Sequence, residues 1–188
     1  MNTQPARRHA LMRIALALSA ALLLQPAASQ AQGLVTTLVT RVFSVTHAPV
    51  ATILVTAGSA GHTLGDLRVL PATPILDTND AEVGRLDAQL LTTSIDYPTA
   101  GDEVRMTTLN FVFGEGTQDL SGSADQLVVS GSGYYPGTSS TIAVGAALIR
   151  PITGGSGKFS GAGGWAESEH LQDGSWRHTF HLRRVVRR

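Results

Sequence analysis

The densest group of side chains able to do chemistry lies near the C-terminus. It contains two glutamates and three histidines: Glu167, Glu169, His170, His178 and His181. Carboxylate and imidazole groups are common ligands of zinc, so a metal site is one interpretation. However, His178 and His181 are three residues apart, and on a β-strand this spacing points their side chains to opposite faces. We therefore expect no metal site here, and the sequence predicts no cofactor.

A glycine-rich segment is the second candidate. It begins Gly154-Gly155-Ser156-Gly157, and glycine-rich loops bind phosphate where a helix begins directly after them. The residues that follow, 159–164, are rich in glycine and serine, and a strand-like run comes next. The spacing matches neither of the common nucleotide-binding patterns. We interpret the segment as a tight connection between strands, in which the glycines serve the backbone.

Five side chains are predicted to line a binding pocket. They are His47, Asn110, Tyr134, Tyr135 and Trp165. Aromatic rings with one polar group suit a small apolar cavity, and packing in the core is the alternative role for each. No residue is assigned a catalytic role, because no serine lies in the Gly-x-Ser-x-Gly pattern of a nucleophile elbow.

The elements that would position these residues are β-strands. All 20 glycines follow residue 32, and they separate short runs rich in valine, threonine, isoleucine and phenylalanine. This arrangement predicts many strands joined by turns. Along one run, Leu109, Phe111 and Phe113 share a face, which is the alternation expected of a strand with one buried side. The sequence therefore predicts an all-β fold, a closed antiparallel barrel of about eight strands with its core at about 36–184.

The N-terminal segment, residues 1–31, is predicted to be a signal peptide. Three arginines precede the apolar run Ile14–Leu24, which is too short to span a bilayer, and Ser29-Gln30-Ala31 fits a cleavage site. The mature chain, residues 32–188, is then a single domain that we expect to be secreted or periplasmic. It has no second long apolar run, so no membrane span is expected.

Removal of the signal changes the charge of the chain. The whole chain has 14 basic and 14 acidic residues; the signal holds three of the arginines and no acidic residue, so the mature chain has 11 basic and 14 acidic residues. Four of these 11 are arginines in a short C-terminal tail, residues 183–188. The body is therefore acidic, which argues against a nucleic-acid partner.

Five sequence patterns occur in the order found in a known group of barrels. They are Leu64–Leu67 with Ile75–Asp77, Val83-Gly84, Gln126–Gly131, the glycine-rich Ile152–Gly164, and Asp173–Trp176 with the run after it. Together these patterns, which cover about residues 64–182, resemble the allene oxide cyclase and dirigent superfamily. The resemblance implies an eight-stranded barrel with an apolar central pocket, and a homo-oligomer, either a dimer or a trimer.

Two departures from that resemblance concern chemistry. Dirigent proteins generally carry an arginine where Gly163 stands, and plant allene oxide cyclases carry a carboxylate on the first strand, whereas Leu34–Leu64 contains no aspartate or glutamate. We therefore expect a barrel that binds an apolar small molecule without the family's catalytic groups. The alternative is a stereocontrolling cyclase or isomerase that acts mainly through shape and the exclusion of water.

We predict that export removes residues 1–31. The charged start, the apolar run and the small residues around the cleavage site occur in the order that a signal peptidase requires. N-terminal sequencing of the exported protein should begin at Gln32. A mature protein that retains Ile14–Leu24 would contradict the prediction.

Overall fold

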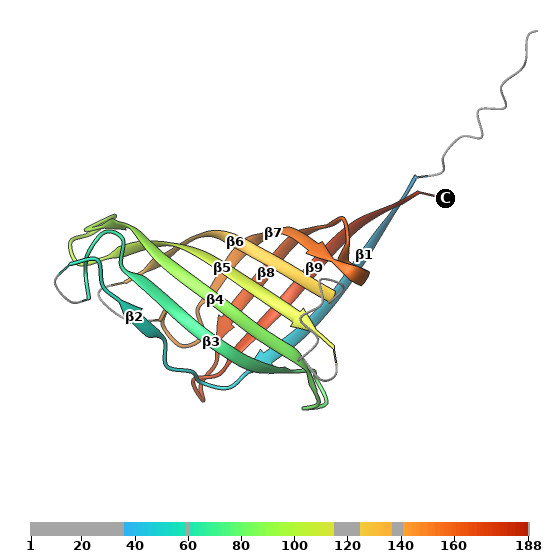
Figure 1. The fold of residues 1–188 in the computed structure, drawn as a ribbon, viewed down its shortest axis with the longest axis horizontal. Helices are drawn as coiled ribbons and strands as arrows, with labels where there is room; N and C mark the ends of the chain where they lie inside the picture. Colours follow the sequence, from blue (N-terminus) through green and yellow to red (C-terminus); the bar gives the residue numbers. More distant parts are fainter. Residues whose placement is uncertain (1–35, 59–60, 115–124, 137–140, 188) are drawn as a thin grey trace, which may run out of the picture. The chain divides into compact units, whose positions relative to one another are not determined.

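Nearly all the regular structure in the computed structural model is β-strand (Figure 1). The structure describes residues 36–58, 61–114, 125–136 and 141–187. The elements in chain order are β1 (Thr36–His47), β2 (Ile53–Val55), β3 (Leu67–Leu76), β4 (Glu82–Ile95), β5 (Glu103–Phe113), β6 (Asp125–Tyr135), β7 (Ala147–Ser156), η1 (Gly157–Phe159), β8 (Ala162–His170) and β9 (Trp176–Arg187). Within these ranges, no helix is long and apolar enough to cross a membrane.

Eight of the strands close into an antiparallel barrel. Hydrogen bonds join them in the order β1-β9-β8-β7-β6-β5-β4-β3, and β1 meets β3 again through the pair Thr46 and Leu76. The short strand β2 pairs with the beginning of β3, where Ile53 lies opposite Val69, whereas β1 pairs with the end of β3. The predicted fold class, an all-β closed antiparallel barrel of about eight strands, is confirmed.

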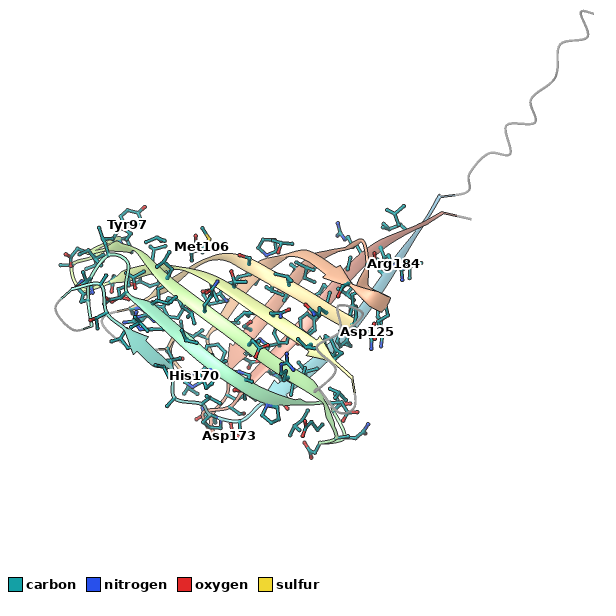
Figure 2. All side chains as sticks on the ribbon, viewed as in Figure 1. Tyr97, Met106, Asp125, His170, Asp173 and Arg184 are labelled. Atoms are coloured by element: carbon teal, nitrogen blue, oxygen red, sulfur yellow. The ribbon has the colours of Figure 1, made fainter. Side chains whose placement is uncertain are left out.

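The interior side chains change in character along the barrel. On β5 the inward positions are, in order, Glu103, Arg105, Thr107, Leu109, Phe111 and Phe113, all of them buried. The strand therefore runs from a charged end to an aromatic end. In Figure 2, Tyr97, which follows β4, marks the charged end, and Asp125, which begins β6, marks the aromatic end.

All five phenylalanines of the chain gather at the aromatic end. They are Phe43, Phe111, Phe113, Phe159 and Phe180. Neighbouring rings have centroids 4.8–6.3 Å apart, in stacked and edge-to-face arrangements, which are the favourable geometries for aromatic pairs. This part of the barrel is therefore a packed core.

The glycine-rich segment is a tight connection between β7 and β8, as expected. The glycines of Gly154-Gly155-Ser156 end strand β7, and a single 3-10 turn follows in place of an α-helix. Gly157 has a φ of +55°, and a Cβ atom there would lie 2.2 Å from Oδ1 of Asp125. A Cβ atom on Gly155 would lie 2.7 Å from the carbonyl oxygen of Gln126. These glycines let backbone segments approach each other closely.

Replacement of Gly164 by alanine should destabilise the barrel. Gly164 has a φ of +117°, and a Cβ atom would lie 2.0 Å from the carbonyl oxygen of His181 on β9. We expect the free energy of unfolding to fall by about 1–3 kcal/mol, because both the backbone conformation and the contact become strained. Urea unfolding of Gly164→Ala measures the loss. The neighbouring Gly163→Ala is the matched control, since no atom lies within 4 Å of its Cβ position; equal stability of the two variants would contradict this account.

Candidate functional site

A cavity of about 400 Å³ lies in the barrel between its aromatic end and its charged end. On β5 the cavity is lined by Thr107 and Leu109, which lie between the charged pair Glu103 and Arg105 and the core residue Phe111. A volume of this size suits one small molecule. The order of side chains along β5 thus determines where the cavity lies.

The cavity wall is apolar on one side and polar on the other. The aliphatic lining residues come from β3, β4 and β5 and are Leu70, Leu86, Ala88, Leu90 and Leu109. The polar lining residues in the strands are His47, Thr107, Tyr135, Arg150, Ser168, His170 and His178. The connection between β1 and β2, residues 49–52, completes the wall. This combination allows the cavity to hold an apolar body and to orient it through a few polar groups.

His178 on β9 is a buried histidine with one free ring nitrogen. Its Nδ1 atom shares a hydrogen bond of 2.9 Å with the hydroxyl of Ser168 on β8, whereas Nε2 is buried and has no hydrogen-bond partner among the described residues. Burial, followed by the nearby charges of His47 and Arg150, holds the pKa of His178 well below its usual value. The imidazole is therefore neutral at neutral pH.

His47 on β1 stacks against His178, with ring centroids 5.3 Å apart. Its Nδ1 atom donates a hydrogen bond of 2.7 Å to the carbonyl of Ala48, so Nε2 is the basic nitrogen of the neutral ring. Burial lowers the pKa of His47, although the hydrogen bond to Ala48 opposes that shift. Two neutral imidazoles thus lie together in the cavity wall, where either can accept or share a proton with a bound molecule.

Arg150 on β7 brings a guanidinium group to the same wall. Its Nη2 atom donates hydrogen bonds to the hydroxyl of Tyr135 at 3.0 Å and to the hydroxyl of Thr107 at 3.3 Å. Arg150 is only 3% exposed. The polar side of the cavity therefore carries a permanent positive charge.

A buried ionic network closes the charged end of the barrel. Glu103, which is fully buried, is 2.7 Å from Arg105, 3.3 Å from Arg68 and 3.0 Å from His62, and it accepts a hydrogen bond from Thr92. Burial alone would raise the pKa of Glu103, but the hydrogen bonds and charges of its basic neighbours outweigh that effect and hold the pKa below its usual value. Glu103 is therefore ionised at neutral pH.

The network is joined to the cavity through one aromatic ring. The guanidinium carbon of Arg105 lies 4.3 Å from the ring centroid of Tyr135, which is a favourable cation–π contact. The hydroxyl of the same tyrosine accepts the hydrogen bond from Arg150. Tyr135 is thus held on its face by the network and presents its hydroxyl to the cavity.

Two of the five residues predicted to line a pocket are found in the cavity wall. These are His47 and Tyr135. Tyr135 is 3% exposed and His47 is 5% exposed. The structure brings them into one wall with Arg150 and His178, which the prediction did not include.

The other three predicted residues do not line the cavity. Tyr134 is 42% exposed and donates a hydrogen bond of 2.7 Å to Asp102. Trp165 stacks on His181 with centroids 4.6 Å apart, on the face of the sheet opposite to the inward residues. Asn110 lies between two inward residues of β5, so it points away from the interior.

His178 and His181 are on opposite faces of β9, because His178 is buried inside the barrel and His181 stacks on the outer Trp165. The part of the chain that the structure describes contains no group of three or more side chains arranged to hold a metal ion.

Comparison with known proteins identifies the fold. No protein-family model matches the sequence, and no curated protein matches it. Among solved structures, a protein described as pyocyanin demethylase matches at 17% identity and a TM-score of 0.52, covering 77% of this chain and 99% of that one. The Diels-Alderase AbmU from Streptomyces koyangensis matches at 21% identity and a TM-score of 0.50, covering 100% of this chain and 83% of that one. The pterocarpan synthase dirigent protein GePTS1 has 15% identity and a TM-score of 0.49 over 85% of this chain and 92% of that one.

The chain therefore has the same fold as the protein described as pyocyanin demethylase and as the Diels-Alderase AbmU. The barrel fold that the sequence resemblance implies is therefore confirmed. At these identities the likeness concerns the arrangement of the strands, and the site has to be understood from its own residues.

Replacement of Glu103 by glutamine should destabilise the protein by about 3–5 kcal/mol at neutral pH, because it leaves Arg68 and Arg105 buried without a carboxylate. Urea unfolding of Glu103→Gln measures the change. Glu169→Gln is the control: its exposed ion pair with Arg177 should contribute about 0–1 kcal/mol.

The effect of Glu103 should also depend on pH. Because its pKa is lowered by folding, its contribution is complete above the usual value of 4.5 and is lost as the pH falls through the lower folded-state pKa. The stability of the wild-type protein should therefore approach that of Glu103→Gln in acid. A difference that stays constant down to low pH would contradict the ionised network.

Proposed function

We propose that this barrel binds a small apolar molecule in its central cavity. The observation that carries the proposal is the cavity itself: about 400 Å³, with an aliphatic wall from β3 to β5 and a short polar wall opposite. Small-molecule sites have this character, an apolar concave surface with a few polar groups that fix orientation. In keeping with the predicted signal peptide, we propose that binding takes place outside the cytoplasm.

Two features of the barrel support the proposal. The packed phenylalanine core lies on one side of the cavity and the ionic network on the other, and each group is held in place by contacts among its own members. In addition, proteins with the same fold include one described as a Diels-Alderase and one described as pyocyanin demethylase, names that refer to reactions of small organic molecules.

The second candidate function is a stereocontrolling cyclase or isomerase. The observation that favours it is the stacked pair His47 and His178, two neutral imidazoles in the cavity wall, each with a ring nitrogen that the protein leaves available. Such groups move protons in general acid–base catalysis. No aspartate or glutamate lines the cavity among the described residues, so the carboxylate of plant allene oxide cyclases has no counterpart there. Protein purified from its host separates the candidates: a binder retains its molecule unchanged, whereas a cyclase converts it.

Filling the cavity should abolish binding. Ala88 lines the cavity from β4, and phenylalanine at this position occupies the space that a ligand would need. We expect Ala88→Phe to weaken the affinity for N-phenyl-1-naphthylamine, a neutral fluorescent probe of apolar cavities, at least tenfold. Gln89→Phe is the control, because Gln89 is exposed on the outer face of the same strand. Unchanged binding by a folded Ala88→Phe variant, as judged by circular dichroism, would show that the probe binds elsewhere.

A further inference from the structure

Arg150 is a buried cation with no counter-ion among the residues that the structure describes. Both hydrogen bonds of its Nη2 atom go to neutral hydroxyl groups, those of Tyr135 and Thr107. Its Nε atom is buried and has no hydrogen-bond partner among the described residues. An unpaired charge in a protein interior is strongly unfavourable, so a cation left in this state at a cavity wall indicates that a ligand completes the site.

The other buried arginines of the barrel each have a carboxylate partner within the protein. Arg68 and Arg105 both form ion pairs with Glu103. In the described part of the chain, by contrast, no ion pair includes Arg150, and no aspartate or glutamate lines the cavity. Among the described residues, the barrel thus supplies a carboxylate for the arginines of its charged end and none for Arg150, which faces the cavity.

The neighbouring histidines do not change the sign of this charge. Burial lowers the pKa of both His47 and His178, so both rings are neutral at neutral pH. Arg150 is itself one of the groups that disfavour protonation of His178. Arg150 therefore remains the fixed positive charge of this part of the cavity wall.

The strand beside Arg150 makes room for its guanidinium group. A Cβ atom on Gly133 of β6 would lie 2.5 Å from Nη2 of Arg150. Gly133 has an extended backbone that other residues can adopt, since its φ is not positive. The glycine is therefore required by the position of the guanidinium rather than by the backbone, which indicates that the arginine is held in a defined place against the strand.

From these observations we infer that the ligand of the cavity is an organic monoanion. Its acidic group, a carboxylate or a group of similar charge and shape, pairs with the guanidinium of Arg150 and accepts a hydrogen bond from Nε. Its apolar body lies against Leu70, Leu86 and Leu109. A guanidinium group suits this role because its planar donors match the two oxygens of a carboxylate. The inference rests on the proposed function, since it names the class of molecule that the same cavity binds.

The test compares an acid with its neutral analogue. N-phenyl-1-naphthylamine serves as the reporter, and 1-naphthylacetate and 1-naphthylacetamide, which have nearly the same shape, compete with it at neutral pH. We expect the acid to displace the reporter from the wild-type protein at a concentration at least about tenfold lower than the amide, because a hydrogen bond to a charged group is worth about 1.5–3 kcal/mol. In Arg150→Gln the acid should lose this advantage, so that the concentrations of acid and amide that displace the reporter become about equal.

A second variant keeps the inference testable if Arg150→Gln does not fold. Gly133→Ala retains the charge but displaces the guanidinium, because the end of the arginine side chain is the part that has to move. We expect the preference for the acid to fall several-fold in this variant. Equal displacement by acid and amide in the wild-type protein would overturn the inference, as would a preference for the acid that survives in folded Arg150→Gln or, failing that, in Gly133→Ala. Failure of the proposed function has a different signature: the reporter and both competitors would not bind at all.

Discussion

The carboxylate of Glu103 is the contact on which the rest of the barrel interior depends. It lies on β5 and binds Arg68 of β3, a hydroxyl of β4 and Arg105 of its own strand. Arg105 in turn covers the ring of Tyr135 on β6, whose hydroxyl accepts a hydrogen bond from Arg150 of β7. One buried negative charge therefore orders side chains on five consecutive strands, and it does so because neither arginine can remain buried there without it.

This arrangement explains why the barrel has a cavity at all. At the other end of the barrel, phenylalanine rings fill the interior at ordinary packing distances. If the same apolar packing continued, the interior would be solid. Between Phe111 and Arg105 on β5, however, the inward residues are the smaller Thr107 and Leu109. The space remains because the aromatic core on one side and the charged residues on the other are each held by their own partners.

The sequence predicted the framework better than it predicted the site. Runs of β-branched residues and clustered glycines are local signals, and they were sufficient for the strands, the barrel and the connection at Gly157. The polar wall depends on partners far apart in the sequence, such as Arg150 with Tyr135 and Ser168 with His178. No local pattern reveals such pairs.

One signal for the site was nevertheless present in the sequence. Arg105 and Glu103 fall on the same face of their strand as Leu109 and Phe111, so the alternation already placed two charges inside the barrel. The same alternation places Asn110 on the outer face. An inward charge between apolar neighbours is unusual enough to mark either a network or a binding site.

The barrel is closed unevenly, and this affects how its interior can diversify. Between β1 and β3 the ring is joined by the single pair Thr46 and Leu76, and residues 49–52, which line the cavity, continue the wall beyond that pair outside any strand. Sequence changes in residues 49–52 can alter the shape of the cavity without removing hydrogen bonds between the long strands. The shape of the cavity can therefore change at this seam while the ion pairs of Glu103 and the strand ladders around them stay the same.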